Sequence, residues 1–277
     1  MYGVVTRNPD EVAWDDFDRA FYEVKDVTGR SAEPLPDAVN MVSCFGDNAA
    51  ADAEPSLVPV DDQGRPATRE RTYFDWAYIC PTREEYREGL LEIIDDCVAV
   101  NEDIRLDDVG FPRPEYCRCD VCEAAFAESE YDDRFAWRAA VITDFVADAT
   151  AHIPGKTYLT CYPDPYPGHL YERAGLDLEA LEAHVDEFVV PLYDMAYETT
   201  YWLEVIAKGF QSQLDIPFSI ELYAIDIELE NLRKATEVAS AYANDVYFGY
   251  EASNARATLR RMKADAREGV SHGDPSR

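Results

Sequence analysis

The sequence predicts an α/β chain folded as a single (β/α)8, or TIM, barrel, and two observations carry this prediction. Short apolar runs rich in Val, Ile, Tyr and Phe alternate along the chain with longer stretches of helical periodicity. Eight such runs can be distinguished, and their continuous apolar character is typical of strands buried on both faces of a parallel sheet. Alternation of eight strands with helices indicates a barrel.

The expected strands are Tyr2–Thr6, Val39–Cys44, Trp76–Cys80, Ile104–Val109, Thr157–Tyr162, Phe188–Tyr193, Phe218–Tyr223 and Val246–Tyr250. Helical patterns occupy 132–151, 177–184, 198–211, 228–243 and 255–268. Another helix is expected after Pro81, where Thr82 and Glu85 form a capping-box pattern. We expect one domain, residues 1–268, followed by a flexible tail, residues 269–277. The long loop over residues 45–75 is expected to help form the functional site.

Four cysteines have the spacing of a metal site. Cys117, Cys119 and Cys122 form a C-x-C-x2-C motif, and Cys80 lies upstream in an Ile-Cys-Pro sequence. Four thiolates are typical ligands of a tetrahedral zinc ion, and a closed four-thiolate shell leaves no open position for catalysis. The sequence therefore predicts a structural zinc, against the alternative of unrelated cysteines.

The composition is strongly acidic but has enough apolar residues to form a core. The 277 residues include 56 acidic and 25 basic side chains, a net charge of −31, while 47% are hydrophobic. The acids are spread along the whole chain, and only five basic residues are Lys. Because molar salt screens such self-repulsion, this pattern indicates a halophile, haloarchaeal in character. An acidic surface for a basic partner would concentrate the charge in one block.

Several partners and locations are disfavoured. The sequence has no basic stripe for nucleic acid and no apolar run long enough to span a membrane. It also has no signal-peptide pattern, so reduced thiols and a cytoplasmic location are expected. The oligomeric state, including a homo-oligomer, stays open.

Carboxylates and aromatic residues gather where the expected strands end, which is where barrel enzymes carry their sites. The acidic pair Asp107-Asp108 lies in the fourth strand and Glu221 in the seventh. An unpaired Glu between apolar strand residues is costly, so Glu221 is expected to have a task. The expected substrate-binding residues are Trp76, Tyr162, Asp164, Tyr193, Asp194, Tyr223 and Glu251. Carboxylates in an aromatic cup suit a carbohydrate, and glycoside hydrolysis needs two carboxyl groups.

These motifs together resemble the family 42 glycoside hydrolases, the β-galactosidase barrels. The resemblance rests on Cys80-Pro with the Tyr86-Arg helix start, on the four-cysteine set, on the acidic pair and on the Glu of the seventh strand. It implies that Asp108 is the general acid/base, that Glu221 is the nucleophile, and that Asp107 replaces the Asn preceding the family's acid/base Glu.

The resemblance covers residues 75–125 well and the rest of the chain at the level of the fold. The chain departs from the family because Asp107-Asp108 stands where the family has Asn-Glu. The same pair also resembles the strand-four Asp nucleophile of α-glycosidase and α-galactosidase barrels. In that arrangement the acid lies on a later strand, where Asp164 or Asp194 would serve.

The sequence therefore predicts a glycoside hydrolase from a halophile, with a carboxylate pair acting on a carbohydrate beside a structural zinc. A second hypothesis keeps the reaction but places the nucleophile on Asp107 or Asp108. A third is a non-catalytic carbohydrate-binding barrel, or a glycosidase-like barrel repurposed for another partner.

The acid excess generates a prediction about salt. Because carboxylates repel one another when screening is weak, we expect the free energy of unfolding to fall in dilute KCl relative to molar KCl. A loss of about 2 kcal/mol would lower the Tm of a chain of this size by roughly 4–8 °C. Thermal melting followed by circular dichroism at both salt concentrations measures this shift, and a Tm that ignores salt would contradict the halophile interpretation.

Overall fold

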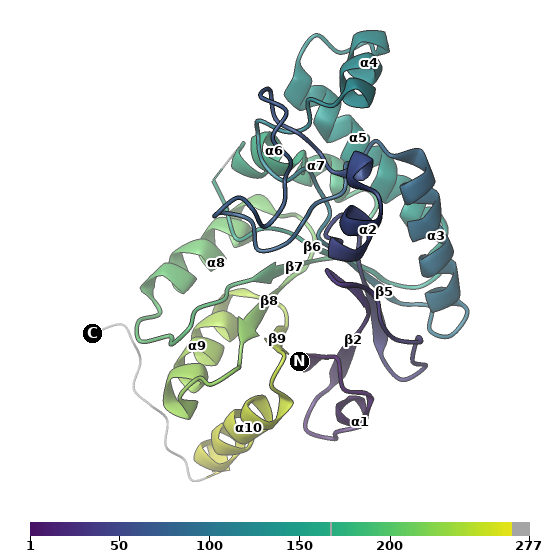
Figure 1. Cartoon of the computed structure of the whole chain (residues 1–277). Helices are drawn as coiled ribbons and strands as arrows, with labels where there is room; N and C mark the ends of the chain where they lie inside the picture. Colours follow the sequence, from purple (N-terminus) through teal and green to yellow (C-terminus); the bar gives the residue numbers. More distant parts are fainter. Residues whose placement is uncertain (167, 268–277) are drawn as a thin grey trace.

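Eight parallel strands close into a barrel, as the sequence predicts (Figure 1). The computed structural model describes residues 1–166 and 168–267, so the expected tail, residues 269–277, lies outside the described residues. The barrel strands are β1 (Tyr2–Thr6), β2 (Arg19–Asp26), β4 (Val39–Ser43), β5 (Ile104–Asp107), β6 (Thr157–Thr160), β7 (Glu187–Pro191), β8 (Phe218–Tyr223) and β9 (Val246–Gly249). β3 (Gly29–Arg30) pairs antiparallel with β2 outside the barrel wall.

The number of strands is correct, but two assignments are wrong. Trp76–Cys80 is not a barrel strand, because this extended segment bonds to loops: Ile79 N–H donates to the Phe45 carbonyl at 2.8 Å, and Cys80 N–H to the Leu57 carbonyl at 2.8 Å. The missing strand is β2, which lies between β1 and β4. Its inward positions carry charged residues, so it lacks the continuous apolar run that marks the other strands.

Most of the helices lie outside the barrel and cover its apolar outer surface. The helices are α1 (Pro9–Val12), α2 (Asn48–Ala53), the 3-10 turn η1 (Pro55–Leu57), α3 (Glu84–Val98), α4 (Asp120–Glu128), α5 (Arg134–Ala151), α6 (His169–Ala174), α7 (Leu178–Leu181), α8 (Tyr201–Gln213), α9 (Leu229–Tyr242) and α10 (Ala252–Arg267). α5 shows how sequence sets these elements, because Asp133 caps its first turn and its buried face carries Trp137, Ile142 and Phe145. Within residues 1–166 and 168–267, no helix combines the length and apolarity that crossing a membrane requires.

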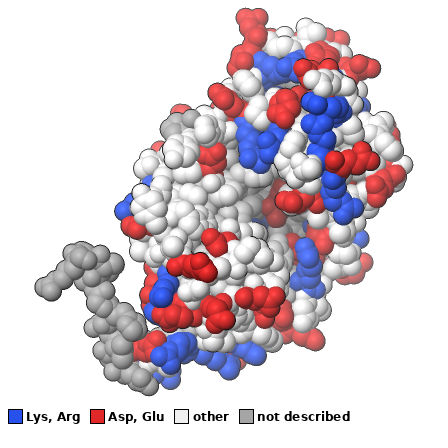
Figure 2. All heavy atoms as spheres, turned by 60° about the vertical axis from the view of Figure 1, so that its left-hand side comes forward, with Lys and Arg blue, Asp and Glu red and all other residues white. Residues whose placement is uncertain are grey.

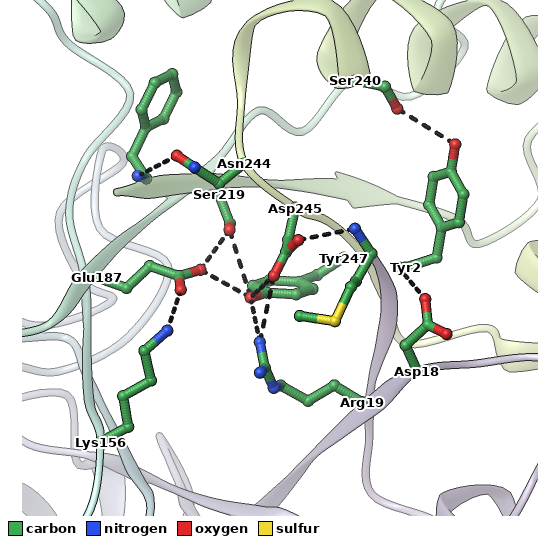
Figure 3. A network of polar contacts seen from close by, with 12 residues as sticks. Tyr2, Asp18, Arg19, Lys156, Glu187, Ser219, Ser240, Asn244, Asp245 and Tyr247 are labelled. Carbon is green, nitrogen blue, oxygen red and sulfur yellow. Dashed lines mark hydrogen bonds and ion pairs between the residues drawn. The ribbon is translucent and has the colours of Figure 1, made fainter. Parts of the chain in front are cut away.

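The lower half of the barrel is a sealed core. An apolar cluster fills its interior with Val5, Phe21, Val39, Met41, Tyr158, Val189 and Tyr247. Below it, at the amino-terminal ends of the strands, a polar network joins five strands (Figure 3). Buried Glu187 accepts hydrogen bonds from Tyr247 Oη at 2.8 Å and from the Ser219 hydroxyl, and it pairs with Lys156 Nζ at 2.6 Å. Because the polar groups drawn there satisfy one another, this end is suited to stability rather than chemistry.

The strand register places polar residues at the opposite, carboxyl-terminal end. Ser43 of β4 pairs with Asp107 of β5, at the last rung of both strands. Glu221 of β8 stands beside Pro191 of β7 and Tyr247 of β9. The long loop between β4 and α3 folds over this end, with α2 and η1 inside it.

Candidate active site

A cavity of about 510 Å³ opens where the strands end. Its wall comes from residues that follow or end almost every barrel strand, with one contribution from the long loop. The acidic lining residues are Glu23, Asp26, Asp107 and Asp108, the basic ones are Arg7 and Arg105, and the aromatic ones are Trp76, Tyr162, Tyr193, Tyr223 and Tyr250. Carboxyl groups among aromatic rings are the lining that the sequence predicts.

The pair Asp107-Asp108 brings two adjacent carboxyl groups into the cavity. Neighbouring residues of a regular strand point to opposite faces, so a continued strand would turn one of them outward. Instead the backbone of Asp108 has a φ of +50°, in the left-handed region. Its N–H donates to Asp107 Oδ1 at 2.9 Å, which fixes this turn. The left-handed residue is therefore what allows both side chains to line one site.

The carboxyl group of Asp108 favours the protonated form. Burial raises the pKa of Asp108 to about 8, and the neighbouring Asp107 carboxylate adds to the rise. The Ser43 hydroxyl, which donates to Asp108 Oδ2 at 2.5 Å, and the Lys25 ammonium group oppose it. Lys25 is itself buried and donates to the Ser43 carbonyl at 2.7 Å. An Asp with this pKa holds a proton at neutral pH and can act as an acid.

The indole of Trp76 offers a hydrogen-bond donor beside the same carboxyl group. Its Nε1 is buried and has no hydrogen-bond partner among the described residues. A Cβ on Gly46 would lie 2.9 Å from Trp76 Nε1 and 2.8 Å from Asp108 Oδ2, so a larger residue there would displace one of these groups. A buried N–H without an acceptor costs free energy, which an oxygen atom of a ligand would recover.

A third carboxyl group, Glu23 of β2, lines the cavity together with Arg7 and Tyr250. Burial raises the pKa of Glu23 to about 7, although Arg7 and the Tyr250 hydroxyl favour its ionised form. Tyr250 Oη donates to Glu23 Oε1 at 2.9 Å, and Arg7 Nε bonds to Glu23 Oε2. Tyr250 has a φ of +72°, an unusual value for a bulky residue, so the ends of β5 and β9 both leave regular geometry at this cavity.

Glu221 lies below the cavity rather than in its wall. Its side chain has no exposed surface. Arg105 Nη1 pairs with Glu221 Oε2 at 2.5 Å, and the Tyr193 hydroxyl donates to Oε1. Burial alone would lower the pKa of Arg105, but the Glu221 and Asp107 carboxylates raise it above its ordinary value. Gly249 leaves the space for this group, since a Cβ there would lie 3.0 Å from Glu221 Oε1.

The other predicted site residues divide into two groups. Trp76, Tyr162, Tyr193 and Tyr223 line the cavity together with the acidic pair. Asp164, Asp194 and Glu251 are not among its lining residues and bond to groups outside it instead. Asp164 pairs with His169 at 2.9 Å, Asp194 accepts backbone N–H groups of residues 196 and 197, and Glu251 accepts the N–H of residue 226.

Sequence reasoning missed Glu23, Asp26, Arg7 and Arg105. The first two belong to β2, which was not recognised, and Arg7 directly follows β1. One signal was present in the sequence. Glu23 lies between Phe21 and Val24, in a run of residues that favour strands, and a charged residue within such a run could have indicated a strand position that faces a site. Arg105 is buried within the predicted fourth strand, where its need for a carboxylate partner was a second signal.

The four predicted cysteines converge in space, and all of the described cysteines are free thiols. The Sγ atoms of Cys80, Cys117, Cys119 and Cys122 lie within 4.8 Å of one another, and Cys80 and Cys122 are 3.3 Å apart. In a tetrahedral zinc site with Zn–S bonds of about 2.3 Å, the sulfurs are roughly 3.8 Å apart, so this cluster fits such an ion. The side chains are compatible with a metal site.

Thr82 is not the helix cap that its sequence pattern suggests. The cap position of α3 is Arg83, which makes no side-chain capping bond. The Thr82 hydroxyl lies 3.2 Å from the Sγ atoms of both Cys80 and Cys122. The hydroxyl is therefore turned toward the sulfur cluster and away from the helix end.

Comparison with known proteins identifies the fold. No protein-family model matches the chain, and no curated protein sequence matches it. Among solved structures, the α-L-fucosidase isoenzyme 2 from Paenibacillus thiaminolyticus is similar with a TM-score of 0.65 and 12% identity, over 98% of this chain and 50% of the fucosidase. A family GH18 chitinase from Cycas revoluta is similar with a TM-score of 0.57 and 10% identity, over 96% of this chain and 99% of the chitinase. The chain thus spans about half the length of the fucosidase, and it has the (β/α)8 fold of these glycoside hydrolases.

The raised pKa of Asp108 predicts a specific pH dependence of stability. A carboxyl group whose folded-state pKa exceeds its unfolded value stabilises the fold at low pH, and this contribution is lost as pH rises toward 8. We therefore expect the free energy of unfolding to fall less between about pH 5 and pH 8 in Asp108→Asn than in wild type, by up to about 1.4 kcal/mol for each pH unit of this range.

Urea unfolding at constant molar salt measures this slope. Asp194→Asn is the matched control, because it removes an acidic group that does not line the cavity and that accepts backbone N–H groups, and it should keep the wild-type slope. Equal slopes in wild type and Asp108→Asn would show that Asp108 is not a buried, protonated acid.

Proposed function

We propose that the cavity hydrolyses a glycosidic bond, with Asp108 as the proton donor and Asp107 as the nucleophile. The observation that carries the proposal is the pairing of a carboxyl group whose pKa is raised to about 8 with a second carboxyl group beside it, in an aromatic cavity. Glycosidases use one protonated and one ionised carboxyl group, which flank the glycosidic bond. The barrel fold, shared with a fucosidase and a chitinase, supports the reaction class by analogy.

The roles follow from what each side chain contacts. Asp108 would protonate the leaving oxygen, and the unpartnered Trp76 N–H would bind a substrate oxygen nearby. Asp107 lines the cavity and would attack the sugar carbon as the bond to the leaving oxygen breaks. A water molecule, deprotonated by Asp108, would then release the sugar from Asp107. Glu23 would bind a sugar hydroxyl, held in place by Tyr250. The aromatic rings would pack on the C–H faces of the sugar.

Asp107 is preferred over Glu221 as the nucleophile, although the resemblance to family 42 implies Glu221. Both oxygens of Glu221 are occupied by Arg105 and Tyr193, and none of its surface is exposed. Glu221 would then be a positioning residue that holds Arg105 and Tyr193 under the sugar. Removing one partner of a buried ion pair costs about 3–5 kcal/mol, so Glu221→Gln is expected to lower stability as well as turnover.

We also propose that the four-cysteine cluster binds one structural zinc ion. All four ligands would come from the protein, which leaves no position for a substrate or water. The ion would join the end of the long loop, at Cys80, to the segment after β5, at Cys117, Cys119 and Cys122. Together with the acid excess, this gives a zinc-containing glycoside hydrolase of a halophile.

The test of the reaction is hydrolysis of a panel of nitrophenyl glycosides in molar salt by four variants. Asp107→Gly and Asp108→Asn should each lower kcat by about 10²–10⁴-fold, the usual loss when a positioned acid, base or nucleophile is removed. Sodium azide should restore turnover to Asp107→Gly by attacking the sugar in place of the missing carboxylate. Azide rescue of Glu221→Gly instead would move the nucleophile to Glu221.

Asp164→Asn is the control for the rival acid, and it should retain activity. A loss as large as that of Asp108→Asn would place the acid on the loop after β6. Sugars that bind to wild type, seen by calorimetry, without any hydrolysis in the panel would mean that the barrel binds carbohydrate but does not cleave it.

Elemental analysis tests the metal site. We expect about one zinc per chain in wild type and in Cys97→Ser, a buried cysteine outside the cluster, but a large loss of zinc in Cys122→Ser. Because zinc binding stabilises the fold, Cys122→Ser should also melt at a lower temperature. A metal-free wild-type protein whose four cluster thiols titrate freely would exclude a resident metal.

A further inference from the structure

The most exposed large apolar side chains of the described residues lie on one part of the surface. Met195 is 78% exposed, Tyr201 76% and Tyr166 64%, ahead of every other large apolar residue in the described ranges. Tyr166 lies between β6 and α6, Met195 lies between β7 and α8, and Tyr201 is the first residue of α8. These segments follow the consecutive strands β6 and β7, so all three residues lie on one side of the carboxyl-terminal end of the barrel.

This area connects with the cavity through residues that belong to both. The ring of Tyr193 lines the cavity yet is 43% exposed, and its centroid lies 5.4 Å from that of Tyr223. On the neighbouring loop, Pro163 lines the cavity. Two residues later, Pro165 packs closely against Gly209 of α8: a Cβ added to Gly209 would lie only 2.4 Å from the Pro165 ring. Both loops therefore run outward from the cavity to the exposed residues. We call Tyr166, Tyr193, Met195 and Tyr201 the outer wall.

One side of the molecule carries a surface area that is poor in charge. Figure 2 brings this side of the molecule forward and shows a broad uncharged area bordered by acidic and basic side chains. Such an area is unusual in a chain with a net charge of −31, in which acidic residues are spread along the whole sequence. Exposed apolar area bordered by charge is typical of a binding surface.

We propose that the outer wall binds the part of a glycan that projects from the cavity, so that the substrate is an oligosaccharide or polysaccharide. This inference rests on the proposed function. Three of the four residues are tyrosines, whose rings can pack on the C–H faces of sugar units. The outer wall continues from the cavity, which suits a glycan that places one end in the cavity and extends along the surface.

The chemistry favours a glycan over a second copy of the protein. Interfaces between copies bury one packed core, whereas the outer wall consists of separate side chains spread along two loops and a helix end. Two copies that carry −31 each would also repel one another at low salt. An uncharged glycan meets no such repulsion.

The test compares long and short substrates in the double variant Tyr166→Ser/Tyr201→Ser. The probes are unsubstituted cello-, manno-, xylo- and chitotetraose, together with the nitrophenyl glycoside of the same sugar. We expect the ratio of kcat/KM for the tetrasaccharide to kcat/KM for the nitrophenyl glycoside to fall about tenfold relative to wild type, because one or two stacking contacts are lost. The matched control is Tyr131→Ser, an exposed tyrosine 37% accessible on another segment, and it should keep the wild-type ratio.

Binding without turnover separates this inference from the proposed function. Calorimetric titration of the tetrasaccharides into Asp107→Asn, with and without the outer-wall substitutions, measures affinity in a protein that cannot cleave. A tenfold weaker Kd in the outer-wall variant supports the inference even if no hydrolysis is found in wild type. An unchanged ratio and an unchanged Kd would overturn it, as would light scattering that shows the same substitutions converting a dimer to a monomer without affecting glycan affinity.

Discussion

The buried ion pair between Arg105 and Glu221 is the constraint on which the rest of the site depends. Both side chains are at most 1% exposed, and the charge of each is acceptable there only because the other is present. Arg105 also donates from Nε to Thr160, so one guanidinium group links β5, β6 and β8 across the barrel interior. Below this pair the barrel is packed and sealed, and above it the cavity begins. The pair is thus the floor of the site.

Polar groups are satisfied at one end of the barrel and strained or unpaired at the other. At the amino-terminal end, the Glu187 carboxylate is hydrogen-bonded and its side chain is buried, so it is not accessible to a ligand. At the other end, Asp108 and Glu23 have raised pKa values, Trp76 keeps an unpaired N–H, and the left-handed residues Asp108 and Tyr250 depart from regular backbone geometry. Desolvation and unusual backbone conformations both cost stability, and they gather where a ligand could recover part of that cost. This contrast supports the assignment of the cavity more strongly than any single residue.

Sequence reasoning recovered the barrel because seven of its eight strands fall on the apolar runs that the sequence predicts. It failed at β2, where the inward residues Arg19 and Glu23 are charged and hide the strand, and at Trp76–Cys80, where a loop segment has strand-like composition. The acidic pair and the four cysteines could be recognised from the sequence, because their residue types and spacing alone indicate their chemistry. The position of Glu221 could not be found, because its depth depends on Arg105 and on the register of β8 against β9, which no local pattern encodes.

The four-cysteine cluster has a consequence for the unfolded chain. A metal that joined Cys80 to Cys117 would close a loop that contains α3, β5 and both Asp107 and Asp108. Closing a loop of this length removes chain entropy worth on the order of 3 kcal/mol from the unfolded ensemble. The ends of α3 and β5 would then stay near one another even when the barrel opens. A bound metal ion would therefore assist folding of the site, because it restricts the conformations that the unfolded segment must sample before Asp107 and Asp108 reach their folded positions.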